Sequence, residues 1–136
     1  MGKIEHVSDT ALMVAACRAM ETVRPDGLVR DPFAASLADD KGMAIAKSSS
    51  GMEWMSFAIG IRSRFIDDLL TSELERGEIE TVLNLGAGLD TRPWRMDLPS
   101  GLRWIEADYP DMIAYKRERL GDARPRCALQ QIAADL

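Results

Sequence analysis

The sequence predicts an α/β fold in which a doubly wound parallel sheet follows an N-terminal helical extension. Apolar residues recur at helical spacing through residues 8–76. From residue 79 onward, patterns typical of buried strands alternate with helical patterns. Because consecutive parallel strands need crossover connections, this alternation indicates a parallel sheet. We therefore assign residues 1–77 to the extension and residues 78–136 to the sheet domain.

The extension is predicted to contain three helices. Ser8 or Asp9 can cap the first helix, Pro32 suits the first position of the second, and Gly77 ends the third. The predicted ranges are residues 8–20, a short helix that starts at residue 31, and residues 52–76.

The third predicted helix is amphipathic, and Arg62 falls in the middle of its apolar face. A cation that points towards a core is costly unless an anion meets it. Three interpretations stay open: an internal salt bridge, an arginine that extends to solvent over a thin edge of the core, and an arginine that binds an anionic ligand group. The apolar face is formed by Trp54, Met55, Ala58, Ile61, Phe65, Ile66 and Leu69.

The sheet domain is predicted to contain strands at residues 79–85, 102–107 and 127–134, with a helix at residues 111–120. In such sheets, ligands bind beyond the carboxyl ends of the strands. Gly86 and Gly88 directly follow the first strand, within "NLGAGLDTR". Glycine permits positive φ and lets a ligand approach the backbone closely. A tight turn without a ligand would give the same two-glycine pattern.

Two acids stand at the end of the second strand. Glu106 and Asp108 follow Gly86 by about 20 residues. An acid at this place can accept hydrogen bonds from the hydroxyls of an adenosine ribose. Both the enzymes that use NAD and those that use S-adenosyl-L-methionine (SAM) have this arrangement.

Other residues distinguish the two cofactors. Thr91 stands where the dinucleotide motif has its third glycine, and the carboxylate of Asp90 would repel a diphosphate. SAM has no phosphate; its sulfonium and amino group suit a nearby carboxylate, and its own carboxylate suits Arg62. Asp135, after the third strand, can meet the adenine amino group. The full set favours SAM over NAD as the cofactor.

The composition argues against several other classes of protein. A net charge of −5 disfavours binding to a nucleic-acid backbone. His6 is the only histidine, and Cys17 and Cys127 lack metal-ligand spacing, so we predict no metal site and two reduced thiols. The sequence shows no apolar run of membrane-spanning length and no signal-peptide core. We therefore expect a cytoplasmic protein.

Five segments that cover nearly the whole chain resemble a known family. In order they are "TALMVAACRAMETVRPDGLVRDPFAASLA", "IRSRFIDDLL", "NLGAGLDTRPWRMDLP", "WIEADYPDMIAYKRERL" and "AADL". The combination of "GAGLDTR" with the later "EADYP" is specific. The chain resembles the leucine carboxyl methyltransferase-like family, which includes many SAM-dependent methyltransferases. The resemblance implies their Rossmann-like sheet, so residues 78–136 would be the truncated first half of a SAM-binding domain.

The resemblance implies roles in cofactor binding but names no catalytic residue. Arg62 would bind the methionine carboxylate of SAM. Asp108 would hold the ribose, with Glu106 as the second choice, and Asp135 and Leu136 would border the adenine. The complete set of expected cofactor-binding residues is Arg62, Gly86, Gly88, Asp90, Glu106, Asp108, Asp135 and Leu136.

The chain departs from the family in length, since it holds only the first three strands of a larger sheet. It is interpreted as a fragment of a longer enzyme, a truncated gene product, or a half-domain completed by another chain, for example in a dimer. The predicted function is SAM-dependent methylation of oxygen, in a carboxylate or hydroxyl of a small molecule or in a protein carboxylate. The alternatives are a non-catalytic cofactor-binding or decoy module that pairs with a full-length relative and, less favoured, an NAD-dependent dehydrogenase.

Overall fold

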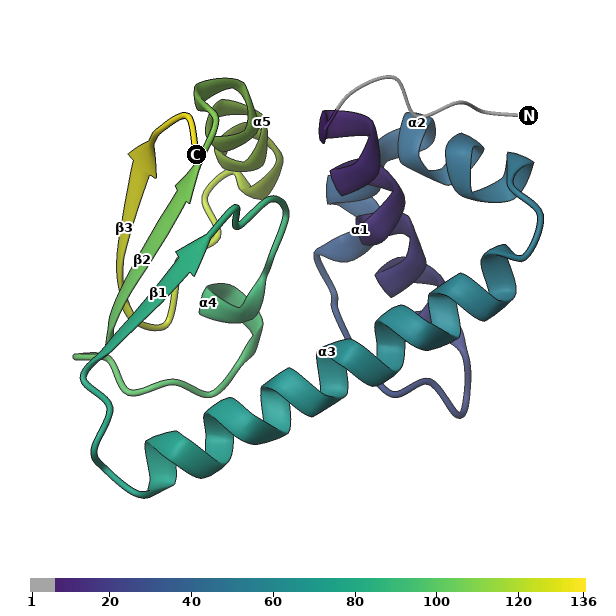
Figure 1. Cartoon of the computed structure of the whole chain (residues 1–136). Helices are drawn as coiled ribbons and strands as arrows, with labels where there is room; N and C mark the ends of the chain where they lie inside the picture. Colours follow the sequence, from purple (N-terminus) through teal and green to yellow (C-terminus); the bar gives the residue numbers. More distant parts are fainter. Residues whose placement is uncertain (1–6) are drawn as a thin grey trace. The chain divides into compact units, whose positions relative to one another are not determined.

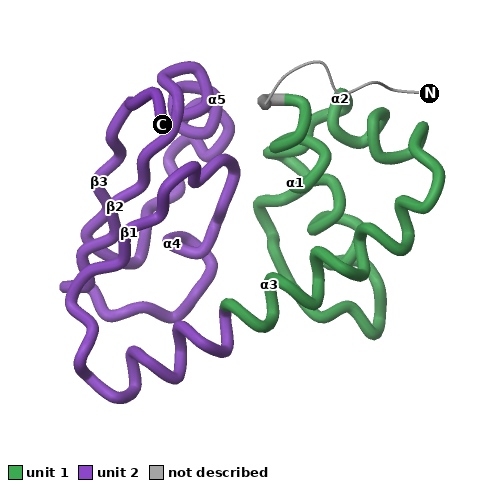
Figure 2. The backbone as a smooth tube through the Cα atoms, in the orientation of Figure 1, with its two compact units in different colours: residues 1–66 green, residues 67–136 purple. Residues whose placement is uncertain are grey.

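The computed structural model of the chain describes residues 7–136, whose helices and strands are drawn in Figure 1. His6 lies outside the described residues. The chain forms two compact units, residues 1–66 and residues 67–136 (Figure 2). The division between the units falls inside one long helix. The domain boundary expected after residue 77 stays a prediction.

The first unit is helical. It contains α1 (Val7–Val23), α2 (Ala34–Ser48) and the first part of α3 (Met52–Glu75). The three predicted helices are confirmed, although the second begins later than expected. Asp31 precedes α2, and its carboxylate accepts hydrogen bonds from Nε of Arg18 at 3.0 Å and from the amide of Phe33 at 3.0 Å. Small and aliphatic side chains form the core of this unit: Leu12, Ala15, Ala16, Val29, Ala34, Leu37, Ala38 and Ile45.

The buried face of α3 differs from the predicted apolar face, so that prediction is wrong. Oγ of Ser56 lies 3.5 Å from Sδ of Met20 on α1, and a Cβ added to Gly60 would stand 2.8 Å from Oε2 of Glu21. Small residues at this contact leave room for the long side chains of Met20 and Glu21 of α1, so residue size selects the buried face. The buried residues are Met52, Ser56, Ile59, Gly60 and Ser63. The large side chains left exposed include Trp54, Met55, Ile61, Phe65 and Leu69.

The second unit contains the sheet. After the end of α3 come β1 (Thr81–Leu85), α4 (Arg92–Arg95), β2 (Arg103–Asp108), α5 (Pro110–Leu120) and β3 (Ala128–Ala133). The strands are parallel and lie in the order β1-β2-β3, which confirms the predicted α/β class. Leu85 pairs with Ala107, and Asp108 with Ala133, so the carboxyl ends of the strands meet at one edge.

The two faces of the sheet are unequally covered (Figure 1). Trp104 of β2 faces the side of α4 and α5 and is 1% exposed. Leu83 and Leu85 of β1 face the opposite side and are 60% and 61% exposed. The buried core consists of Met96, Leu98, Leu102, Trp104 and Cys127, with Leu70, Leu74, Ile79, Val82 and Leu129 packed against it.

Both cysteines are free and buried. Burial raises the pKa of the thiols of Cys17 and Cys127, which disfavours their reactive thiolate forms. In the part of the chain that the structure describes, no helix is both long enough and apolar enough to cross a membrane.

Candidate functional site

The turn after β1 contains two glycines in the left-handed region. Gly86 has φ +65° and Gly88 has φ +53°, and this conformation costs a residue with a side chain roughly 1–2 kcal/mol. The amide of Gly86 donates a hydrogen bond to the carbonyl of Ala107 at 2.8 Å, which ties the turn to β2. Apart from the adjoining residues, a Cβ added to Gly86 would meet no described atom within 4 Å. The space beside this backbone is therefore open, as a closely bound ligand would require.

Asp108 ends β2 beside this turn. Its Oδ2 accepts a hydrogen bond from the amide of Gly88 at 2.7 Å, and its Oδ1 accepts one from the amide of Tyr109 at 2.7 Å. A carboxylate offers about four acceptor sites, so about two remain for other donors, such as a pair of hydroxyl groups. The structure thus brings Asp108 and the glycine turn together.

Glu106 lies two residues before Asp108, on the same face of β2 but deeper under α5. Its Oε1 accepts a hydrogen bond from Nζ of Lys116 at 2.7 Å, and its Oε2 accepts one from Nε2 of Gln131 at 3.2 Å. Nζ of Lys116 also lies 4.9 Å from the ring centroid of Trp94. Burial raises the pKa of Glu106, and Lys116 and Gln131 offset part of that rise. Glu106 therefore joins α5 to the sheet, and its role towards a ribose stays a prediction.

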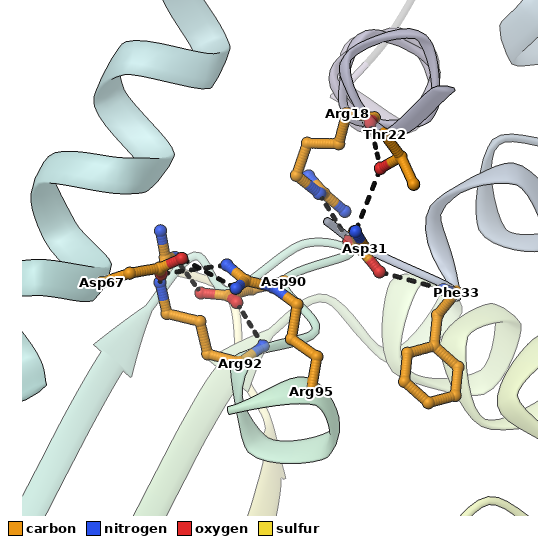
Figure 3. A network of polar contacts seen from close by, with 8 residues as sticks. All are labelled: Arg18, Thr22, Asp31, Phe33, Asp67, Asp90, Arg92 and Arg95. Atoms are coloured by element: carbon orange, nitrogen blue, oxygen red, sulfur yellow. Dashed lines mark hydrogen bonds and ion pairs between the residues drawn. The ribbon is translucent and has the colours of Figure 1, made fainter. Parts of the chain in front are cut away.

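Asp90 lies at the end of the glycine turn, and both of its carboxylate oxygens are engaged within the protein (Figure 3). Oδ2 accepts hydrogen bonds from Nδ2 of Asn84 at 2.9 Å and from Nη1 of Arg92 at 2.8 Å. Oδ1 accepts one from the amide of Arg92 at 2.9 Å. These contacts hold the segment after the turn against β1. A direct contact between Asp90 and a cationic cofactor group stays a prediction.

Asp135 and Leu136 follow β3 at the same edge of the sheet, and both are exposed. The amide of Ala134 donates a hydrogen bond to the carbonyl of Asp108 at 2.9 Å. The phenol of Tyr109 is hydrogen-bonded to the carboxylate of Asp135, and this contact raises the pKa of Tyr109. The structure therefore brings Asp135 to the end of β2. The roles of Asp135 and Leu136 towards an adenine stay predictions.

Arg62 belongs to the first compact unit, whereas the other expected site residues belong to the second. Arg62 is exposed on α3 and does not point into a buried apolar face. Exposure removes the desolvation cost that the predicted apolar face would have imposed on its charge. Its role towards the carboxylate of a cofactor stays a prediction.

Two polar clusters of the second unit were not predicted from the sequence. One joins Lys116 to Glu106, and the place of Lys116 on the buried stripe of α5 was a signal that could have revealed it. The other centres on Asp67, which accepts hydrogen bonds from Nε of Arg92 and from Nη1 of Arg95, both at 2.7 Å (Figure 3). These arginines lie 25 and 28 residues further along the chain, so no local pattern signals the contacts.

Comparison with known proteins connects this arrangement to one family. A family model described as leucine carboxyl methyltransferase matches residues 11–136. Curated bacterial relatives carry the name "putative S-adenosyl-L-methionine-dependent methyltransferase". The relative from Parafrankia sp. (strain EAN1pec) is 39% identical, over 96% of this chain and 45% of its own length.

Two further relatives give the same result. The protein from Rhodococcus jostii (strain RHA1) is 35% identical, over 98% of this chain and 48% of its own length. The protein from Frankia alni (strain DSM 45986 / CECT 9034 / ACN14a) is 37% identical, over 99% of this chain and 51% of its own length. The chain thus spans about half the length of the curated relatives it matches.

Proposed function

The chain belongs to the leucine carboxyl methyltransferase family, and on this premise we propose that it binds SAM at the carboxyl edge of its parallel sheet. The observation that carries the proposal is the 2.7 Å hydrogen bond between the amide of Gly88 and Oδ2 of Asp108. It places a carboxylate with free acceptor sites beside a glycine turn that has open space along its backbone.

Each end of SAM has a chemically suitable partner among the expected site residues. The carboxylate of Asp108 would accept hydrogen bonds from the ribose hydroxyls, and the backbone of Gly86 would lie against the cofactor. The guanidinium group of Arg62 would pair with the methionine carboxylate. Asp135, with Leu136 beside it, would accept a hydrogen bond from the adenine amino group. When bound, SAM supplies an activated methyl group on a sulfonium.

We further propose that the methyl acceptor is an oxygen, either of a carboxylate or of a hydroxyl. The contribution of the protein is to hold the donor and the acceptor in line, because proximity and orientation supply much of the rate of such a displacement. A carboxylate acceptor is already a nucleophile, whereas a hydroxyl would gain from a general base. The acceptor belongs either to a small molecule or to a protein. On this proposal the present residues form the cofactor-binding portion of a cytoplasmic methyltransferase.

One observation favours a second candidate function. Leu83 and Leu85 are exposed on β1, and β1 is an edge strand of the sheet. Exposed apolar residues beside a free edge suit pairing with another polypeptide. The second candidate is therefore a non-catalytic module that binds the cofactor and pairs with a full-length relative. It predicts association and cofactor binding without methyl transfer, even when a polypeptide of full family length is present.

Calorimetric titration with S-adenosylhomocysteine (SAH), the demethylated product of SAM, tests the binding site. Arg62→Ala and Asp108→Ala should each weaken SAH binding by about 10- to 100-fold, because each removes a charge-assisted hydrogen bond. Asp122→Ala, which removes an exposed acid after α5, should leave the dissociation constant unchanged. Unchanged affinity in both site variants would contradict the assignment. Binding of NAD in place of SAH would favour a dehydrogenase.

A further inference from the structure

We propose that Asp67 is a positioning residue for the cofactor-binding turn and that it acts through Arg92 on Asp90. The inference rests on the proposed function, because it concerns the turn to which that function assigns SAM. All three residues belong to the second compact unit, residues 67–136. Figure 3 shows their side chains directed towards one another.

A continuous chain of charged contacts leads from α3 to β1. Oδ1 of Asp67 accepts hydrogen bonds from Nε of Arg92 at 2.7 Å and from Nη2 of Arg95 at 2.9 Å. Oδ2 of Asp67 accepts one from Nη1 of Arg95 at 2.7 Å. Nη1 of Arg92 donates in turn to Oδ2 of Asp90 at 2.8 Å, and the same oxygen accepts from Nδ2 of Asn84 at 2.9 Å. Arg92 therefore bridges two carboxylates, one on α3 and one in the turn.

The cluster of Asp67, Asp90, Arg92 and Arg95 is largely buried. The side chains of Asp67, Arg92, Arg95 and Asp90 are 16%, 12%, 9% and 15% exposed. Burial acts to lower the pKa of Arg92, but the carboxylates of Asp90 and Asp67 outweigh it, and the pKa is raised. Neutralising Asp67 would remove the charge of the carboxylate to which the guanidinium groups of Arg92 and Arg95 both donate hydrogen bonds. Loss of this negative charge is costly in a mostly buried cluster, so Arg92 would be driven to a new arrangement.

The position of Arg92 matters because of the glycines that precede it. Gly86 and Gly88 have no side chains to restrict their backbone, so the turn needs contacts elsewhere to stay in one conformation. Asp90 supplies them by binding both the amide and the guanidinium group of Arg92. Because Asp67 holds the other side of that guanidinium group, α3 determines where the end of the turn lies. A turn held in its binding conformation avoids part of the ordering cost of ligand binding.

Calorimetric titration of SAH into the wild-type chain and two variants tests this role. Asp67→Asn keeps the shape of the side chain but removes its charge, and it should weaken SAH binding about tenfold, equivalent to ~1.4 kcal/mol. Arg92→Lys keeps a cation but loses the planar fork that bridges two carboxylates, and a similar loss is expected. If Asp67→Asn does not fold, Arg92→Lys decides the outcome, because it leaves the contact between Asp67 and Arg95 in place.

Two control variants separate positioning from general stability. Glu73→Gln removes another acid of α3, whose partner Arg76 lies 3.5 Å away in an exposed pair. Leu74→Ala removes packing from the core of the second unit, so it should lower the melting temperature. Both controls should leave SAH affinity unchanged at temperatures where the protein is folded. If Leu74→Ala weakens SAH binding as much as Asp67→Asn does, the role of Asp67 is merely structural. That result would overturn the proposal.

Amide hydrogen exchange gives a readout that needs no cofactor. Asp67→Asn should speed exchange of the amides of Gly88 and Arg92, which the intact turn protects, and should leave the amides of α5 unchanged. If the wild-type chain does not bind SAH, the proposed function fails, and exchange alone decides the role of Asp67. If the wild type binds SAH and both Asp67→Asn and Arg92→Lys bind it equally well, the positioning role is overturned while the proposed function stands.

Discussion

Gly88 donates its amide hydrogen to Oδ2 of Asp108 at 2.7 Å. This hydrogen bond joins the turn after β1 to the end of β2. Because the donor is a backbone amide, the contact depends on the conformation of the turn as well as on the carboxylate of Asp108. The left-handed conformation of Gly86 and Gly88 is therefore a requirement of the site.

Gly86→Ala should lower the free energy of unfolding by about 1–2 kcal/mol, because alanine is strained at a φ of +65°. Steric overlap does not contribute, since a Cβ there would meet no described atom beyond the adjoining residues within 4 Å. Urea denaturation measures the effect. The matched control is Gly101→Ala, at a site that is equally open but lacks a positive φ. Equal stability of the two variants would contradict the strain argument.

Lys116→Met should destabilise the protein by about 3–5 kcal/mol, because it leaves the carboxylate of Glu106 buried without its cation. The double variant Glu106→Gln with Lys116→Met should recover much of this loss, since it removes both charges together. Urea denaturation of the two variants measures the difference. Arg76→Ala, which breaks the exposed pair with Glu73, should change stability by less than about 1 kcal/mol. If Lys116→Met alone is as stable as the wild type, the buried ion pair is ruled out.

The raised pKa of Glu106 predicts a pH-dependent contribution to stability. The folded state binds this proton more tightly than the unfolded state does. The contribution of Glu106 to stability is therefore fully present at pH values below its ordinary pKa of 4.5. It is lost as the pH rises through the folded-state pKa. Glu106→Gln cannot titrate, so the stability of the wild type relative to this variant should fall with rising pH across that window. Urea denaturation of both proteins at a series of pH values tests this prediction. A stability of the wild type that rises with pH, relative to that of Glu106→Gln, would refute it.

Asp135→Asn should lower the pKa of Tyr109 towards the ordinary phenol value of about 10. The hydrogen bond to Asp135 and the charge of that carboxylate are the main causes of the present rise, and asparagine removes the charge. Ultraviolet titration of tyrosinate measures the shift, with Tyr109→Phe to separate its signal from that of Tyr115. Identical titration curves for Asp135→Asn and the wild type would show that the contact is absent in solution.

Much of the second unit was predictable from local patterns. The order of strands and helices follows from the alternation of apolar runs with helical periodicity after residue 79. The turn at Gly86 and Gly88 follows from the conformational freedom of glycine. The place of Asp108 beside this turn follows because parallel strands bring their carboxyl ends to one edge.

The buried face of α3 was not predictable from periodicity. Hydropathy favoured the side that carries Trp54 and Phe65, but these side chains are 72% and 68% exposed. The buried side instead carries Ser56 and Gly60, whose small size leaves room for side chains of α1. A periodic pattern describes one helix by itself, whereas the choice of face depends on the shape of the neighbouring helix.

The α/β class, the glycine turn and the acid at the end of β2 could be predicted, because each depends on the local chain and on the rules of parallel sheets. The partners of the charged side chains, in contrast, depend on the tertiary structure. Glu106 is bound by Lys116, and Asp90 is joined through Arg92 to Asp67, which lies 25 residues before Arg92 in the chain. Charges attract across space whatever their separation in sequence, so folding had to bring α3 and the turn together before this pairing existed.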